Sequence, residues 1–176
     1  MGEITKLKLM EIANRIPLFK ALSLHEKEKV ITINNIVKVI KKDTKFIIYG
    51  DHDDSFYILL NGSAAVYKND RKIATLNGGQ FVGEVGFICR EPSTSSVVAE
   101  TDLITFFFTR DRFLNLPVSL REKIKDGLIG GLVNKIHGMN DEIEGLRQFI
   151  DSLEEETEKQ AKAPVSEINL KKLKSS

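Results

Sequence analysis

Apolar and polar positions follow three successive patterns along the chain, and the first predicts two short helices. Apolar residues recur every two to four positions at Ile4, Leu7, Met10, Ile12 and Ile16. This helix should end before Pro17, because the residue before a proline disfavours helical backbone. Ser23-Leu24-His25-Glu26 has the sequence of a capping box, in which hydroxyl and carboxylate each bind a backbone N–H, so a second helix should begin there.

From Ile36 the pattern changes to short apolar runs rich in Ile, Val, Phe and Tyr. The runs cover residues 36–40, 45–49, 56–60, 64–67, 72–76, 96–100 and 103–109. Turn residues separate them, at Gly50-Asp51, Asn61-Gly62, Asn69-Asp70 and Asn77-Gly78-Gly79. Such strands indicate an antiparallel sandwich or barrel, with a core drawn from Phe46, Phe56, Phe81, Phe87 and Phe106 to Phe108.

The third pattern is a heptad repeat near the C-terminus. Its a and d positions are Ile129, Leu132, Ile136, Met139, Ile143, Leu146, Ile150 and Leu153. Isoleucine at every a position with leucine at most d positions favours a parallel two-stranded coiled coil, so these residues are the expected dimer interface. Glu142 at g would face Arg147 at e of a second copy, an opposite-charge pair that fits the same register. The alternative, packing of the stripe on the chain's own β-domain, is plausible for the first turns, where Leu128 and Val133 widen the apolar face.

Two features of this helix need separate comment. Ser119-Leu120-Arg121-Glu122 has the sequence of a second capping box and predicts where the helix begins. Glycine is costly in a helix, yet Gly131, Gly138 and Gly145 share one heptad position. Either a neighbouring surface approaches the backbone there, or the helix is softened as a hinge, or the coiled coil tolerates glycine; the sequence leaves these readings open.

Composition and charge exclude several classes of protein. The chain has 176 residues, of which 41% are hydrophobic and 29% charged, and its net charge of +1 provides no global field for nonspecific binding of polyanions. A single cysteine, Cys89, excludes an intramolecular disulfide framework. The chain has neither a signal-peptide pattern nor a run of about 20 apolar residues that could span a bilayer. We therefore expect a cytoplasmic protein with no membrane attachment.

One long motif resembles a known family. Gly50-Asp51-His52-Asp53-Asp54-Ser55-Phe56-Tyr57-Ile58-Leu59-Leu60-Asn61-Gly62-Ser63, followed by Gly83-Glu84-Val85-Gly86-Phe87, resembles the cyclic nucleotide-binding domain family. The resemblance extends from Ile16-Pro17-Leu18-Phe19 to about Phe113, and the long helix resembles the dimerisation helix of bacterial catabolite activators.

The resemblance implies a mainly β fold with flanking helices: an eight-stranded antiparallel β-roll of the jelly-roll kind, N-terminal helices and a long C-terminal coiled-coil helix. We expect a helical lead-in over residues 1–34, the β-roll over 35–117, the dimerisation helix over 118–158 and a basic, disordered tail over 159–176.

It also implies a ligand pocket formed by Gly83, Glu84, Val85, Gly86, Ser93, Thr94 and Ser95. In the family, backbone N–H groups of the glycine turn bind a cyclic phosphate and a carboxylate at the position of Glu84 accepts the ribose 2′-hydroxyl. Ser93 stands where the phosphate-binding arginine is expected, and Thr94 where some members carry a serine that also touches phosphate. Loss of one charge-assisted hydrogen bond should weaken binding of cAMP or cGMP by about one to two orders of magnitude or more.

Other chemistry has little support in the sequence. Arg90 could occupy the slot left by Ser93, or it could be a solvated loop residue beside Glu91. His52 among Asp51, Asp53 and Asp54 is best explained as a hairpin connection with solvated carboxylates, so we expect no metal. Cys89 has no base arranged beside it by the sequence, and no catalytic residues are expected.

These expectations combine into a homodimeric regulatory module, not an enzyme, that senses a small ligand and signals through an unidentified protein partner. The alternative is a ligand-free structural adaptor that uses the β-roll and coiled coil for protein–protein interaction. Residues after the coiled coil leave no room for a winged helix-turn-helix, so direct DNA binding is not expected. A DNA contact through Lys171, Lys172 and Lys174 would instead show steep salt dependence.

Overall fold

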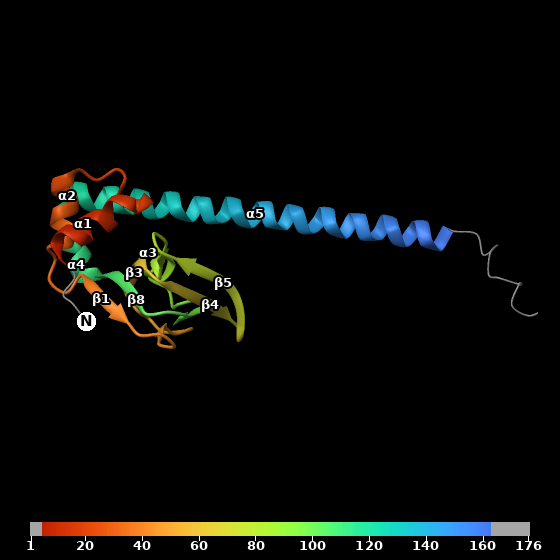
Figure 1. The fold of residues 1–176 in the computed structure, drawn as a ribbon, viewed down its shortest axis with the longest axis horizontal. Helices are drawn as coiled ribbons and strands as arrows, with labels where there is room; N and C mark the ends of the chain where they lie inside the picture. Colours follow the sequence, from red (N-terminus) through yellow and green to blue (C-terminus); the bar gives the residue numbers. More distant parts are fainter. Residues whose placement is uncertain (1–4, 163–176) are drawn as a thin grey trace, which may run out of the picture. The chain divides into compact units, whose positions relative to one another are not determined.

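The computed structural model describes residues 5–162 (Figure 1). The helices are α1 (Lys6–Arg15), a 3₁₀ turn (Pro17–Phe19), α2 (Leu24–Ile31), α3 (Glu84–Cys89), α4 (Arg110–Leu114) and α5 (Val118–Lys162). The strands are β1 (Val37–Ile40), β2 (Lys45–Ile47), β3 (Ser55–Asn61), β4 (Ser63–Lys68), β5 (Arg71–Asn77), β6 (Phe81–Val82), β7 (Ser96–Ala99) and β8 (Leu103–Thr109). Ile4 and most of the predicted disordered tail, with Lys171, Lys172 and Lys174, lie outside the described residues.

The eight strands form two antiparallel four-stranded sheets, in the orders β1-β8-β3-β6 and β2-β7-β4-β5. The predicted mainly β fold with N-terminal helices and a long C-terminal helix is therefore confirmed. Between the sheets lies an apolar core that includes Ile47, Leu59, Val97 and Leu103. Asn69 and Asp70, both with positive φ, form the tight turn between β4 and β5 that their residue types predicted.

The N-terminal predictions are confirmed by the caps that the structure contains. Helix α1 ends at Arg15, two residues before Pro17. The Ser23 hydroxyl accepts from the Glu26 N–H, and the Glu26 carboxylate accepts from the Ser23 N–H, which completes the predicted capping box of α2.

Three local predictions are wrong. Helix α5 begins at Val118, before the proposed capping box at Ser119, because the Pro117 carbonyl accepts from the N–H groups of Leu120 and Arg121 and so closes the first helical turn. The two-residue strand β6 is too short to produce an alternating pattern and was not predicted. The segment from Gly50 to Asp54 is no hairpin, because it joins strands of different sheets: β2 pairs with β7, and β3 pairs with β6 and β8.

By its contacts the chain divides into two compact units, Met1–Gly131 and Leu132–Ser176, and the boundary falls within α5. In the first unit, Leu120, Ile124 and Leu128 are buried at successive turns of the helix. Lys123 lies on the same stretch of α5 and binds both carboxylate oxygens of Glu26 at 2.9 Å, which ties α2 to the helix. Within residues 5–162, no helix has the length and hydrophobicity to cross a membrane.

The shared heptad position of the glycines has two different environments. A Cβ at Gly131 would lie 2.3 Å from ring atoms of Phe81, so the absence of a side chain allows β6 to approach the helix. A Cβ at Gly138 or Gly145 would meet no atom of the described residues within 4 Å. Close packing therefore explains Gly131 but neither of the other two glycines.

These environments predict opposite effects of the same substitution. Gly131→Ala should destabilise the protein, because overpacking costs about 1–3 kcal/mol and exceeds or cancels the roughly 1 kcal/mol gained in helix propensity. Gly138→Ala should instead stabilise it by up to about 1 kcal/mol. Chemical unfolding at fixed protein concentration measures both, and equal effects of the two substitutions would contradict this account.

The Glu26–Lys123 pair predicts a dependence of stability on pH. The hydrogen bond from Lys123, followed by that from the Ser23 backbone, lowers the pKa of Glu26 from 4.5 to about 2. A carboxylate with a lowered folded-state pKa stabilises the fold above its unfolded pKa, and this contribution is lost as the pH falls from about 4.5 towards 2. Glu26→Gln, which preserves a capping-box side chain, should therefore flatten the decline in unfolding free energy over that range.

Unfolding curves at several pH values test this expectation, with Glu11→Gln on the exposed face of α1 as the matched control. A decline that is as steep in Glu26→Gln as in the unmodified protein would show that other carboxylates govern acid unfolding.

Candidate functional site

The site predicted from the sequence is built around α3, the six-residue helix that follows β6. Gly83 caps its N-terminus with φ of 85°, and a Cβ there would come within 2.9 Å of the Ser55 carbonyl oxygen. Only glycine combines that backbone conformation with so close an approach. Glu84 follows as the first helical residue and is only 4% exposed, whereas Val85 is exposed. The helix therefore places one predicted site residue inside the domain and the next on its surface.

Phe87 and Arg110 hold the other end of α3 in place. The Phe87 ring packs edge-on against Phe56 of β3 and Phe113 of α4, with centroids 4.9 and 5.2 Å apart. Arg110, at the start of α4, donates from Nη2 to the Phe87 carbonyl and lies over the Phe87 ring. Its Nε donates to the Asp54 carboxylate. A single guanidinium thus joins α3, α4 and the β2–β3 connection.

The Asp54–Arg110 pair also changes the protonation of the carboxylate. The hydrogen bond from Arg110 lowers the pKa of Asp54, and the charge of nearby Arg90 lowers it further. Asp54 therefore stays ionised well below neutral pH. Sequence reasoning treated Asp54 as a solvated turn residue, because its partner lies 56 positions away and no local pattern connects the two.

A second set of contacts joins the β2–β3 connection to the loop after α3. The Gly50 N–H donates to the Ser93 carbonyl at 2.8 Å, and the Ser93 N–H donates to the Asp51 carbonyl at 2.9 Å. The Tyr49 N–H donates to the Ser96 hydroxyl at 3.0 Å. The backbone of Ser93 is therefore fixed, and the backbone polar groups of this residue are already paired within the protein.

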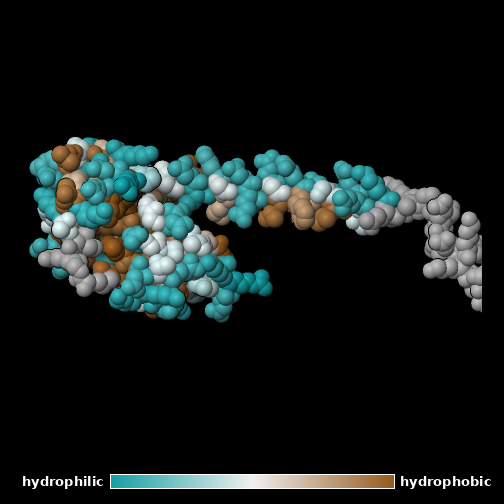
Figure 2. All heavy atoms as spheres, in the orientation of Figure 1, coloured by the Kyte–Doolittle hydropathy of each residue, from teal (hydrophilic) through white to brown (hydrophobic). Residues whose placement is uncertain are grey.

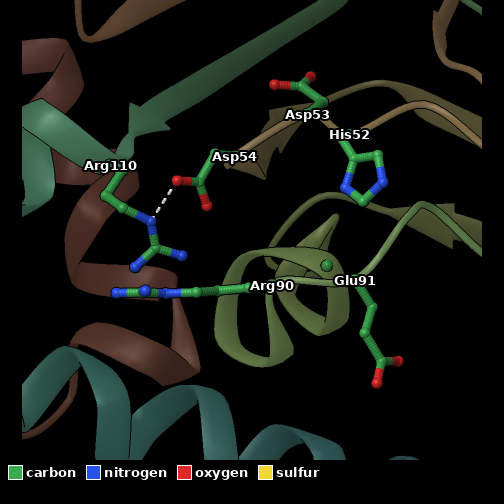
Figure 3. A pocket seen from close by; sticks show the side chains of 7 residues that line it. His52, Asp53, Asp54, Arg90, Glu91 and Arg110 are labelled. Carbon is green, nitrogen blue, oxygen red and sulfur yellow. Dashed lines mark hydrogen bonds and ion pairs between the residues drawn. The ribbon is translucent and has the colours of Figure 1, made fainter.

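Gly86, Ser93 and Thr94 are the predicted site residues that line two cavities, which share Glu91; Gly83, Glu84, Val85 and Ser95 line neither of them. Ser93 and Thr94 line a cavity of about 480 Å³, together with Tyr49, Gly50, Lys68, Glu91 and Pro92. Gly86 lines another of about 350 Å³, with His52, Asp53, Asp54, Arg90, Glu91 and Arg110 (Figure 3). Ser95 is half-buried and starts the turn into β7. Lys68 lines the cavity of Ser93 and was missed by the sequence analysis, because it comes from the end of β4.

Arg90 does not lie in the cavity of Ser93. Its side chain extends beside Arg110, while the carboxylate of Glu91 points the other way (Figure 3). Arg90 caps the C-terminus of α3 with φ of 59°, a left-handed conformation that costs a non-glycine residue roughly 1–3 kcal/mol. The slot-filling reading of Arg90 is therefore wrong, whereas its exposure agrees with the reading as a solvated loop residue. Its place beside Arg110 was not predicted, because only the packed loop brings residues 90 and 110 together.

Metal chemistry finds no support at this site. His52 and its neighbouring aspartates are exposed, and the described residues contain no group of three His, Cys, Asp or Glu side chains that could hold a metal ion. Cys89 is a free, exposed thiol.

Comparison with known proteins supports the assignment that the sequence motif suggested. Residues 37–118 match the family model of the cyclic nucleotide-binding domain. The cAMP-dependent protein kinase regulatory subunit of Candida albicans is 34% identical over 96 residues, which cover 54% of this chain and 21% of that protein. The aligned part thus spans about a fifth of the relative's length.

Solved structures share the fold. A cyclic nucleotide-binding domain from Methylobacillus flagellatus superposes with a TM-score of 0.67 at 24% identity, covering 78% of this chain and 81% of that one. The regulatory subunit of a cAMP-independent protein kinase A from Trypanosoma cruzi, bound to guanosine, gives a TM-score of 0.54 at 23% identity, covering 65% and 42%. Residues 37–118 of this chain belong to the cyclic nucleotide-binding domain family, a family of binding domains found in kinase regulatory subunits.

Proposed function

We propose that the protein is a homodimeric regulatory module whose β-roll senses a small nucleoside-like ligand and whose long helix passes the signal to a protein partner. The observation that carries the proposal is the buried carboxylate of Glu84 at the second position of the glycine turn. Its position in the glycine turn matches the family's ribose-binding carboxylate, and its burial in the first turn of α3 holds it in place, which favours a retained role in ligand binding.

The proposed ligand carries less negative charge than a cyclic nucleotide does. Ser93 supplies a hydroxyl where the family supplies a guanidinium, and its backbone N–H and carbonyl are already paired with Asp51 and Gly50. The arginine contact to a phosphate is therefore missing, although Lys68 lines the same cavity, while a carboxylate is present at the family's ribose-binding position. The Trypanosoma cruzi regulatory subunit, which shares the fold, binds guanosine, a nucleoside without phosphate. We accordingly place nucleosides ahead of cAMP and cGMP as ligands.

The proposed dimer rests on the apolar stripe of α5. From Ile136 to Leu153 its a and d side chains are all exposed; Figure 2 shows apolar side chains gathered along one side of this part of the helix. Leaving such a stripe in water is unfavourable, and the Ile/Leu heptad pattern fits a second, parallel copy of the same helix. Ile129 and part-buried Leu132 would begin the seam where the first unit ends.

The proposed module passes its signal through an unidentified protein partner, without direct contact to DNA or a membrane. A free, exposed Cys89 suits the reducing cytoplasm. The second candidate function, a ligand-free adaptor, is favoured by one observation, the replacement of the phosphate arginine by Ser93. The two candidates differ in whether Glu84→Ala abolishes a ligand-dependent effect.

Because Ser93 stands where the family has its phosphate-binding arginine, restoring an arginine there should strengthen cAMP binding. Ser93→Arg should strengthen cAMP binding by about ten- to a hundredfold, because one charge-assisted hydrogen bond is restored. Calorimetric titration with cAMP, cGMP, adenosine and guanosine measures the change, and the nucleosides should gain nothing. Ser95→Arg, which adds the same charge two residues later, is the matched control.

Two outcomes would count against the sensor. If the unmodified protein binds none of the four compounds and Ser93→Arg does not restore cAMP binding, the pocket is closed and the adaptor is the better explanation. If binding occurs but survives Glu84→Ala, the ligand lies elsewhere.

The apolar stripe formed by the a and d positions of α5 leads to a separate prediction about dimer assembly. Ile143→Asp places a charge at a central a position, so it should dissociate the dimer or weaken it by at least about a hundredfold, since burying an unpaired charge is costly. Gln148→Asp adds the same charge at an f position and should leave the dimer intact. Sedimentation at several concentrations distinguishes the two; a protein that stays monomeric before any substitution refutes the proposed coiled coil.

A further inference from the structure

The cavity beside α3 that Arg90 and Arg110 line is separate from the cavity of Ser93. Its two guanidinium groups come from different elements, the C-terminal cap of α3 and the first residue of α4, and they lie side by side (Figure 3). We propose that this cavity binds the phosphate of a small phosphomonoester, or free phosphate, with Arg90 and Arg110 as the groups that hold the anion. The proposal does not depend on what the β-roll binds.

The first argument is electrostatic. The charge of Arg110 is balanced by Asp54, and two of its N–H groups are used by Asp54 and the Phe87 carbonyl. The side chain of Arg90 is exposed and acts on the Asp54 carboxylate only through its charge, because the hydrogen bond to Asp54 comes from Arg110. Two adjacent cations repel, and an anion that accepts from both removes the repulsion. Phosphate oxygens match the planar fork of arginine donors.

The second argument is the backbone of Arg90. Its φ of 59° belongs to the left-handed region, where glycine is the usual residue at a helix C-terminus. A glycine would make the same turn without strain, so the turn alone does not explain an arginine. The strained conformation places the Arg90 side chain beside Arg110, which is the kind of outlier expected where a side chain is needed for binding.

The carboxylates that line the cavity leave room for an anion beside Arg90 and Arg110. Asp54 is hydrogen-bonded to Arg110 and lies within reach of the charge of Arg90, so this single carboxylate is shared between two cations. The carboxylates of Asp53 and Glu91 point away from the two guanidinium groups (Figure 3). Asp53, Glu91 and His52 line the remainder of the cavity. Their side chains can accept hydrogen bonds from the hydroxyl groups of a sugar. The volume of about 350 Å³ is in the range of small-molecule sites. These features favour a small sugar phosphate over a larger anion.

Titration with inorganic phosphate at constant ionic strength, followed by calorimetry and by NMR of arginine Nε–H signals, tests the proposal. The unmodified protein should bind phosphate, and Arg90→Gln should weaken binding by roughly tenfold or more, since a charge-assisted contact is lost. Arg71→Gln removes the same charge from the exposed edge strand β5 and should leave the affinity unchanged within about twofold.

A second variant excludes misfolding as the cause of a loss. Arg90→Gly keeps the left-handed turn, so it should raise the thermal midpoint while it weakens phosphate binding at least as much as Arg90→Gln does. Ribose 5-phosphate compared with phosphate and with ribose separates the sources: tighter binding of the ester identifies a phosphomonoester, and equal binding identifies free phosphate. Absence of saturable binding up to tens of millimolar, or an affinity unaffected by Arg90→Gln, would overturn the proposal.

Discussion

The packing of Phe56 is the constraint on which the rest of the domain depends. Its ring stacks on Phe108 of the neighbouring strand at 4.8 Å and meets Phe87 of α3 and Phe113 of α4 edge-on. The β-sheet, α3 and the helix that leads into α5 therefore share one fully buried ring. Because interiors are close-packed, a shift of α3 cannot occur without a response from α4. This is the physical route by which an event at the glycine turn would reach α5.

Charge reinforces the same junction. Arg110 begins α4, and its guanidinium connects the Asp54 carboxylate, the Phe87 carbonyl and the Phe87 ring. The β2–β3 connection is held a second time through the backbone of Ser93. The region that the family uses for its ligand is thus fixed by contacts that do not involve a ligand. A pocket of this kind is organised in advance, which lowers the entropic cost of binding.

Helix α5 changes its environment along its length. Its first turns are buried through Leu120, Ile124 and Leu128 and tied to α2 by Lys123, whereas the a and d positions from Ile136 onwards are exposed. Gly131 lies at the last close contact of the first unit, against Phe81. One continuous helix therefore serves two purposes, as part of the domain's core and as the proposed surface for a second copy. Of the residues named for packing on the chain's own domain, Leu128 is buried whereas Ile129 and Val133 are exposed, and the dimer stays a prediction.

The sequence by itself determined the elements whose causes are local. Short apolar runs located seven of the eight strands, the Ser23–Glu26 capping box located α2, Asn69-Asp70 located a hairpin, and the glycine motif identified the family. Only the tertiary structure decided what long-range contacts decide: the pairing of Asp54 with Arg110, the two-residue strand β6, the separation of Arg90 from Ser93, and the different surroundings of Gly131 and Gly138. The reason is physical. Caps, turns and periodicity act within a few residues, whereas the partners of a buried or charged side chain come from wherever the fold places them.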